Sequence, residues 1–293
     1  MGERPPPATL RWLEAVTGGR VARVQALAGA TTSDVHAVRL VAPDGERRTV
    51  VLRRYAVPRV LEEDPGIVRR EAEVLALLDG SELPAPRLLA VDEEGRDADV
   101  PAVAMSHLAG RVEWAPSDLD GWLTRLVDLM ALVHAHPVAV AQVQPFRPYA
   151  PASWDPPPWL RDRGAWDAAV ALAREPRPES ATDVFLHRDL HPGNVLWRRG
   201  EVSGLVDWPS ASIGPPSVDV VHCRTNVLVQ LGVDAAERLE AVWRERTGLG
   251  IDPWIEVVML VDAMWWTERF PRPPAVLRHM EGLLGRALSS LGG

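Results

Sequence analysis

Asp189, Asn194 and Asp207 have the side chains and the spacing that phosphoryl transfer requires. Such a site needs a base that orients a hydroxyl group, and it needs oxygen ligands that hold magnesium against the phosphates of a nucleotide. Asp189 can act as the base, Asn194 offers an amide oxygen five residues later, and Asp207 offers a charged oxygen. Magnesium prefers such hard oxygen ligands, at about 2.0–2.1 Å. The three residues therefore predict a kinase-type site.

Short strands and tight turns are expected to position these side chains. An apolar run typical of a buried strand ends just before Asp189, a Pro-Gly turn follows, and a two-stranded hairpin comes next. These three features are predicted over residues 184–186, 192–193 and 194–206. The antiparallel hairpin predicts that Asn194 and Asp207 converge from adjacent strands.

The run from His187 to Asn194, together with the later Asp-Trp pair at 207–208, resembles the aminoglycoside phosphotransferase and choline kinase branch of the protein-kinase-like fold. In that branch the loop reads His-x-Asp-x-x-x-x-Asn, and Asp-Trp replaces the Asp-Phe-Gly of protein kinases. The resemblance implies that Asp219, which follows a Gly-Pro-Pro segment, hydrogen-bonds the backbone of the catalytic loop. We expect His187 to support the loop and His191 to lie behind the reacting groups.

The chain contains no lysine, and all 32 of its basic residues are arginines. Kinase-like folds grip the nucleotide phosphates with a strand lysine that pairs with a helix glutamate, and the resemblance gives this place to Arg53. Arginine binds phosphate through a planar fork and is not interchangeable with lysine. Glu71 is the expected partner of Arg53, and Arg54 or Glu73 would take these roles if the register shifted by one residue.

Two further stretches are expected to contact the nucleotide. Residues 27–34 resemble the hairpin loop that covers the nucleotide, where small residues let backbone N–H groups approach phosphates, although a plain turn is the alternative. The hydroxyl groups of this loop belong to Thr31, Thr32 and Ser33. The segment of Met105, Ser106 and His107 resembles the hinge that reads the purine edge, and His107 is expected to be solvated.

The resemblance implies an α+β, bilobal protein-kinase-like fold, and the predicted elements follow in the order that such a fold requires. A five-stranded antiparallel sheet and one main helix form a small nucleotide-binding lobe over residues 1–107, ending in the hinge. A larger, mostly helical lobe over 108–293 carries the catalytic and acceptor-binding groups. Strands are expected over 21–27, 35–41, 48–55, 87–91 and 101–108. Helices are expected over 67–78, 117–136, 159–175, 218–231, 235–247, 254–269 and 274–291.

Asp262, Trp265 and Glu268 are the candidates for binding the acceptor. They lie in the helix expected over 254–269, where an acidic and aromatic wall would suit a cationic or sugar-like molecule. Two carboxylates on a helix are also typical of a solvated face, and tryptophan at helical spacing is also typical of a core.

Composition excludes several classes of partner. The net charge of −8 over 293 residues argues against a general polyanion-binding surface, so no nucleic acid partner is expected. No apolar run approaches the roughly 20 residues of a membrane span. The single cysteine, Cys223, excludes an internal disulfide and favours the cytoplasm. We expect a monomer or a homodimer.

The function expected from these features is transfer of the terminal phosphate of ATP or GTP, with Mg²⁺, to a hydroxyl of a small molecule. The resemblance allows aminoglycoside-, macrolide-, choline- and sugar-like acceptors. Two alternatives remain open. A nucleotide-binding pseudokinase with a regulatory role is one, because the lysine is missing. The other is a zinc metallohydrolase that uses His187, Asp189 and His191 as ligands.

Overall fold

The computed structural model describes residues 4–29, 32–139, 142–148, 153–178, 182–269 and 272–292. The chain forms two compact units, which are described separately below. The first comprises Met1–Arg111, Val195–Arg199 and Ser203–Ser210, and the second comprises Val112–Asn194, Gly200–Val202 and Ala211–Gly293. The predicted division into a nucleotide-binding part and an acceptor-binding part stays a prediction.

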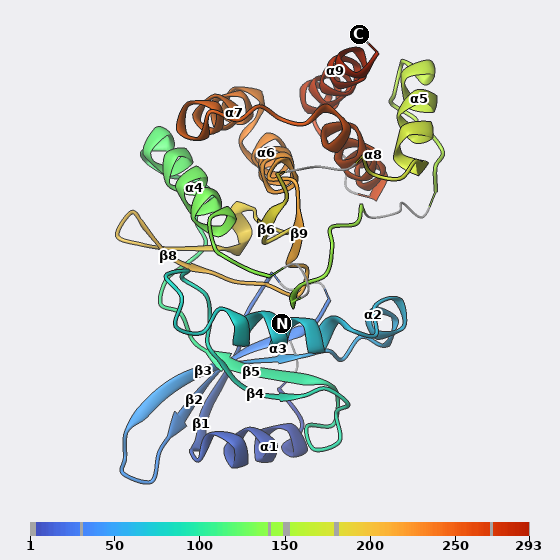
Figure 1. Ribbon diagram of the computed structural model, residues 1–293. Helices are drawn as coiled ribbons and strands as arrows, with labels where there is room; N and C mark the ends of the chain where they lie inside the picture. The colour runs from blue at the N-terminus through green and yellow to red at the C-terminus, as the bar shows by residue number, and fades with distance from the viewer. Residues whose placement is uncertain are drawn as a thin grey trace. The chain divides into compact units, whose positions relative to one another are not determined.

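A five-stranded antiparallel sheet organises the first unit, as the sequence predicts (Figure 1). Each strand lies where the hydrophobic alternation places it, with small shifts at the ends. The order across the sheet is β1 (Arg20–Ala26), β2 (Asp34–Val41), β3 (Arg47–Arg54), β5 (Ala102–Ser106) and β4 (Leu88–Asp92).

The two faces of this sheet are covered by different helices (Figure 1). Val50 and Leu52 of β3 are buried in a core shared with Trp12 of α1 (Pro7–Thr17). Arg53 points to the opposite face, where it meets α3 (Ile67–Leu77). Alternation along β3 thus separates a hydrophobic core from a polar cluster. Sequence analysis did not predict α1 or the short helix α2 (Pro58–Glu63).

The hairpin that follows the catalytic loop consists of β7 (Val195–Arg198) and β8 (Glu201–Leu205). Its two turn residues, Arg199 and Gly200, have φ values of 56° and 79°. Positive φ at both positions is typical of the type I′ turn, whose twist matches that of the strands. The hairpin therefore forms where the Arg-Gly pair predicts it. Strand β7 starts one residue later than expected, because Asn194 belongs to the short 3₁₀ helix η2 (Pro192–Asn194).

The second unit is mostly helical, as predicted. The short strands β6 (Val184–Leu186) and β9 (Ser212–Gly214) pair antiparallel. Apolar residues of α6 and α8, among them Val218 and Ile255, are buried against Leu186 and Phe146. The helices are α4 (Leu119–His134), α5 (Arg163–Arg174), α6 (Ser217–Leu231), α7 (Val233–Thr247), α8 (Pro253–Arg269) and α9 (Pro274–Leu291). Over the described residues, no helix is both long and apolar enough to cross a bilayer.

The helix predicted over 159–175 is wrong at its start, since α5 begins at Arg163. The carboxylate of Asp162 accepts a hydrogen bond from the backbone N–H of Ala165 at 2.9 Å, which caps the helix at that point. Trp159 lies before the cap, and its indole N–H donates to the Thr267 hydroxyl at 2.7 Å. The side chain of Trp159 thus anchors the preceding segment to α8.

Candidate active site

Asp189 lies in the loop that follows strand β6 in the second unit. The preceding residue, Arg188, has a φ of 73°, in the left-handed region that residues other than glycine adopt rarely. Arg188 is buried, and its guanidinium carbon lies 5.0 Å from the centre of the Phe146 ring. Such conformations persist only where the surroundings enforce them, and they cluster at functional sites. The loop is therefore held in a fixed and unusual shape at Asp189.

Asp219, in the first turn of α6, binds the backbone of this loop. Its carboxylate is fully buried and accepts the N–H groups of His187 at 3.1 Å and Arg188 at 2.7 Å. His134 Nε2 lies 3.1 Å from the same carboxylate and donates to it. Burial by itself raises the pKa of Asp219, but hydrogen bonding and the charges of nearby histidines outweigh it and lower the pKa. The backbone contact implied by the resemblance is therefore present, and its role in activity stays a prediction.

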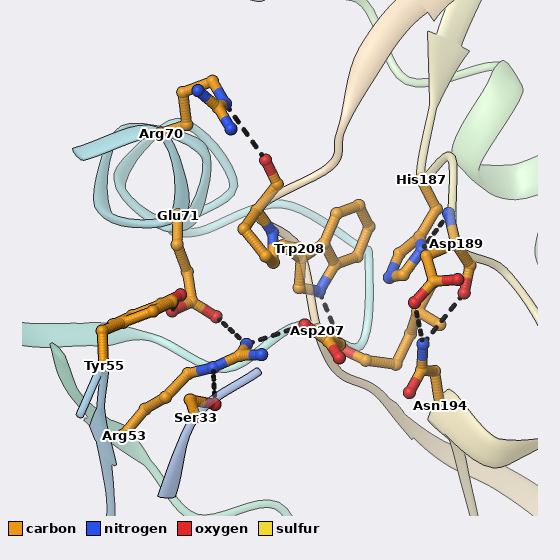
Figure 2. Close-up of polar contacts among 12 residues, drawn as sticks. Ser33, Arg53, Tyr55, Arg70, Glu71, His187, Asp189, Asn194, Asp207 and Trp208 are labelled. Atoms are coloured by element: carbon orange, nitrogen blue, oxygen red, sulfur yellow. Dashed lines mark hydrogen bonds and ion pairs between the residues drawn. The ribbon is translucent and has the colours of Figure 1, made fainter. Parts of the chain in front are cut away.

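The carboxylate of Asp189 is held at both of its oxygens. Figure 2 shows the contacts that come from Asn194. Asn194 Nδ2 donates to Oδ2 at 3.0 Å and to the backbone carbonyl of Asp189 at 2.9 Å. His222 Nε2 lies 2.9 Å from Oδ1. Burial raises the pKa of Asp189, but the hydrogen bond from His222 and the charges of the neighbouring histidines lower it well below its usual range. Asp189 is therefore an ionised carboxylate with a fixed orientation, which is what a base that orients a hydroxyl requires.

Asn194 fits the expected magnesium ligand. Its Nδ2 is used by Asp189, which sets the amide orientation and leaves Oδ1 as the atom available to a cation. A neutral amide oxygen of this kind is a suitable ligand for magnesium. Whether Asn194 and Asp207 converge on one ion stays a prediction.

Hydrogen bonding of the histidines argues against the zinc alternative. Within the described residues, the group able to surround a metal ion is Asp189, His191 and His222, whose ligand atoms lie within 4.8 Å of one another. The predicted third ligand, His187, instead accepts the N–H of Asp189 at its Nδ1, at 3.3 Å. His191 Nδ1 accepts the N–H of Gly193 at 3.1 Å, so the proton of a neutral ring sits on Nε2. His222 Nε2 carries a proton that faces Asp189. A zinc-binding nitrogen must be unprotonated, so zinc would have to break these contacts.

A second polar cluster lies in the first unit around Arg53 (Figure 2). Arg53 Nη1 donates to Glu71 Oε1 and to Asp207 Oδ1, each at 2.7 Å. Arg53 Nε donates to the Ser33 hydroxyl at 2.8 Å, and the Tyr55 hydroxyl donates to Glu71 Oε2 at 2.8 Å. The pair of Arg53 with Glu71 is thus formed as the sequence predicts, and its part in nucleotide binding stays a prediction.

Arg53 lies between two carboxyl groups in this cluster. Burial lowers the pKa of Arg53, but Glu71 and Asp207 outweigh it and raise the pKa, so the guanidinium stays protonated. Burial raises the pKa of Glu71, against the opposing effect of Arg53. Asp207 is the more accessible acid, since its side chain is 33% exposed and that of Glu71 is 2% exposed. Asp207 is therefore the carboxyl group of this cluster that a ligand could reach, and its part in holding magnesium stays a prediction.

The backbone at Asp207 is also unusual, with a φ of 74°. The next residue, Trp208, is buried, and its indole N–H donates to the carbonyl of Leu205 at 2.8 Å. Arg70 Nε donates to the carbonyl of Pro209 at 3.3 Å, which ties this turn to α3 (Figure 2). The Asp-Trp pair thus sits in a turn that is fixed on both sides.

The remaining residues expected to contact the nucleotide lie in the loop before β2 and in the predicted hinge. Thr31 lies outside the described residues, and Thr32 is half-buried. The hydroxyl of Ser33 is buried and engaged by Arg53. In the predicted hinge, Met105 and Ser106 end strand β5, and His107 is exposed.

The predicted acceptor residues lie on α8, as expected. Burial raises the pKa of Asp262, while the charges of Arg188 and His222 lower it. Asp262 is therefore close enough to the catalytic loop for the charge of Arg188 to change its pKa. Trp265 is half-buried and meets the exposed Trp266 edge to face, with ring centres 5.2 Å apart. The backbone of Glu268 belongs to α8, but its side chain lies outside the described part.

Sequence analysis missed two site residues, His134 and His222. A signal existed for His222, because it follows Asp219 by three residues and so faces the same side of α6. No local pattern marked His134, which ends α4 and reaches Asp219 only through the tertiary fold.

Comparison with known proteins identifies what this arrangement is similar to. A profile of the phosphotransferase enzyme family matches residues 24–254. A search of curated proteins finds no match.

Solved structures share the fold over nearly the whole chain. Macrolide 2′-phosphotransferase MphH from Brachybacterium faecium has a TM-score of 0.59 and 17% identity, covering 95% of this chain and 98% of that chain. A ternary complex of aminoglycoside phosphotransferase APH(4)-Ia with ADP and hygromycin B gives 0.63 and 18%, covering 98% and 99%. A GDP complex of aminoglycoside 2′-phosphotransferase-IIIa gives 0.56 and 16%, covering 93% and 91%. These similarities show that the chain has the kinase-like fold of these enzymes.

Proposed function

Because the chain belongs to the phosphotransferase enzyme family, we propose that it transfers the terminal phosphate of ATP or GTP to a hydroxyl group of a small molecule. The observation that carries this proposal is the ionised carboxylate of Asp189, fixed by His222 and Asn194 on a loop that Asp219 holds. A carboxylate in this state can accept a hydrogen bond from an incoming hydroxyl and orient its oxygen for attack.

In the proposed reaction, the acceptor oxygen forms a bond to the terminal phosphorus while the bond to the leaving nucleoside diphosphate breaks. The hydroxyl proton passes to Asp189 as its oxygen becomes bonded to phosphorus. The low pKa of Asp189 keeps the carboxylate ready to accept it at neutral pH. Positioning supplies most of the catalysis in such reactions, so the fixed orientation of Asp189 matters more than its basicity.

The donor is held by residues of the first unit in this proposal. Arg53, oriented by Glu71, binds the phosphates, and the backbone of Met105, Ser106 and His107 reads the purine. Structures of similar enzymes contain ADP, AMP-PNP or GDP, which supports a nucleotide donor. Both adenine and guanine nucleotides are therefore candidate donors. Asp207 and Asn194 are the residues that would hold Mg²⁺, which when bound neutralises the charge of the phosphates.

The acceptor is proposed to lie beside α8, against Asp262 and Trp265. The charge of His222 lowers the pKa of Asp262, and His222 contacts Asp189. A molecule bound at Asp262 would therefore lie close to the base. A half-buried carboxylate three residues before a tryptophan on the same helix suits a sugar-like or amino-bearing alcohol. The solved relatives that act on macrolides or bind hygromycin B support a small-molecule acceptor of this general kind.

The proposal is tested with Asp189→Asn. The variant is expected to bind nucleotide with the affinity of the parent, because Asp189 belongs to a different compact unit from Arg53. Its turnover should fall by about 10²- to 10⁴-fold, because the amide cannot accept the proton. Nucleotide dissociation constants from calorimetry and kcat with a panel of aminoglycoside, macrolide and amino-alcohol acceptors provide the measurement.

The matched control is Asp128→Asn, an exposed aspartate of α4 that pairs with Arg246. It is expected to keep the kcat of the parent. Turnover by Asp189→Asn within about twofold of the control would remove Asp189 from the mechanism.

A further inference from the structure

We propose that Ser33 is a positioning residue, whose hydroxyl fixes the guanidinium of Arg53 so that an arginine can grip nucleotide phosphates where related folds use a lysine. This inference rests on the proposed function, because it concerns how that function binds its phosphate donor. It assigns Ser33 to the arginine rather than to the phosphates themselves.

The backbone places Ser33 and Arg53 on one face of the sheet. Ser33 directly precedes β2, and within the sheet Val35 pairs with Arg53. Residues two apart on a strand share a face, so Ser33 lies on the face that carries Arg53 and Tyr55. The Ser33 hydroxyl accepts Arg53 Nε–H at 2.8 Å, and both residues are buried. The contact follows from strand register and is not a chance meeting of surface side chains.

The contact with Ser33 leaves one terminal nitrogen of the Arg53 guanidinium, Nη2, for a phosphate. Nε donates to Ser33, and Nη1 donates to Glu71 and to Asp207. Because Nε and Nη1 are both held, the planar guanidinium cannot rotate, and the direction of Nη2 is set (Figure 2). Within the described residues, the hydrogen bonds and ion pairs of Arg53 use Nε and Nη1 and leave Nη2 open. Its two N–H groups are the pair that a phosphate oxygen would meet.

A lysine at position 53 would not need Ser33. Its ammonium carries three donors on a single nitrogen, which could serve Glu71, Asp207 and a phosphate. Lysine has no donor that corresponds to Nε. The need for a hydroxyl at position 33 is therefore a consequence of arginine at position 53, in a chain without lysine.

Removing the hydroxyl leaves a buried Nε–H without its acceptor and frees the guanidinium to turn. A hydrogen bond to a charged group contributes about 1.5 kcal/mol or more, which corresponds to about tenfold in a binding constant. Ser33→Ala is therefore expected to weaken nucleotide binding by about tenfold. Ser33→Thr, which keeps the hydroxyl, is expected to bind nucleotide like the parent.

The test is a double-mutant cycle in which calorimetry measures the binding of ATP and of GTP with magnesium. The four proteins are the parent, Ser33→Ala, Arg53→Lys and the double variant. The inference predicts that Ser33→Ala weakens binding in the arginine background and changes it by less than about twofold in the lysine background. Ser81→Ala is the control, since the Ser81 hydroxyl accepts the backbone N–H of Leu83 within its own turn.

Equal losses in both backgrounds would overturn the inference, because Ser33 would then act on the phosphates directly. Unchanged binding by Ser33→Ala in the arginine background would overturn it as well. Ser33→Cys, of nearly the same size and with a weak acceptor, repeats the cycle if Ser33→Ala does not fold, and the same pattern is expected. A parent protein that binds no nucleotide would refute the proposed function, an outcome distinct from binding that is insensitive to Ser33.

Discussion

The carboxylate of Asp219 is ionised although it has no exposed surface, because His134 and two backbone N–H groups of the catalytic loop donate to it. A buried charge of this kind is costly unless every lone pair is used. The donors come from two segments, α4 and the catalytic loop, so the one side chain fixes both against α6. The shape of the loop at Asp189 therefore depends on a residue that touches no reacting atom.

Asp219→Asn is expected to lower the free energy of unfolding by about 3 kcal/mol at pH 7, because the amide offers one acceptor oxygen where the carboxylate offers two. The pKa of Asp219 in the folded protein lies below its unfolded value of about 3.9. Its stabilising effect is therefore complete above about pH 5 and is lost progressively as the pH falls below about 3.9 and through the lower pKa of the folded protein. Urea unfolding of parent and variant between about pH 7 and pH 3 measures the difference.

The exposed control Asp128→Asn is expected to change the unfolding free energy by less than about 0.5 kcal/mol throughout this range. A destabilisation by Asp219→Asn that did not shrink toward low pH would show that ionisation of Asp219 is not what stabilises the loop.

At the scale of elements, Arg224 joins three helices of the second unit. It lies on α6, is 2% exposed, and pairs with Glu240 of α7 at 2.6 Å and with Glu256 of α8 at 2.5 Å. The helices also pack through apolar residues, but the ion pairs fix their angular register. Apolar periodicity predicted that these helices exist and left open which faces meet.

Arg224→Met is expected to destabilise the protein by about 3–5 kcal/mol, because it leaves two partly buried glutamates without their partner. Arg59→Met is the matched control, since Arg59 forms an exposed pair with Glu63 on α2 and such pairs contribute less than about 1 kcal/mol. Chemical denaturation of both variants measures the difference. If the two variants lost the same small amount, Arg224 would not join the helices as described.

At the scale of the whole molecule, the two compact units are not continuous in sequence. Residues 195–199 and 203–210 belong to the first unit, although the chain has already entered the second. Because the chain returns to the first unit, Asp207 contacts Arg53 although the two residues are 154 positions apart in sequence. Arg53 thus contacts two carboxyl groups, and that of Asp207 is the more accessible.

Nucleotide with magnesium is therefore expected to stabilise the protein against heat, more than nucleotide alone. A ligand present at about 100 times its dissociation constant adds about 2.7 kcal/mol. Scanning calorimetry with ATP or GTP, with and without magnesium, measures the effect. Asp207→Asn is expected to lose the part of the shift that depends on magnesium.

Separate scans with zinc and with a chelator test the alternative. Absence of any nucleotide response, combined with destabilisation by the chelator, would point to a metal site at Asp189, His191 and His222. A nucleotide shift without magnesium dependence would instead favour a binding module with little transfer activity.

Local signals predicted much of this protein. The alternation of β3, the Arg-Gly turn of the hairpin and the amphipathic α3 each reflect interactions within one segment, and each forms where expected. Helix α1, which was not predicted, also has a local sequence signal. Pro7 stands at its start, and Gly18, with a φ of 68°, follows its end.

The pairing of Arg53 with Glu71 was expected from the resemblance, in which a strand cation pairs with a helix glutamate. Alternation and helical periodicity place each side chain on a face and left Arg54 and Glu73 as alternatives. The contacts of Ser33, His134 and His222 were decided only by the tertiary structure. Each joins segments whose separation in sequence carries no periodic signal, so their meeting depends on sheet register and helix packing. The sequence by itself determined which chemistry the residues can perform, and the fold decided which neighbours hold those residues in place.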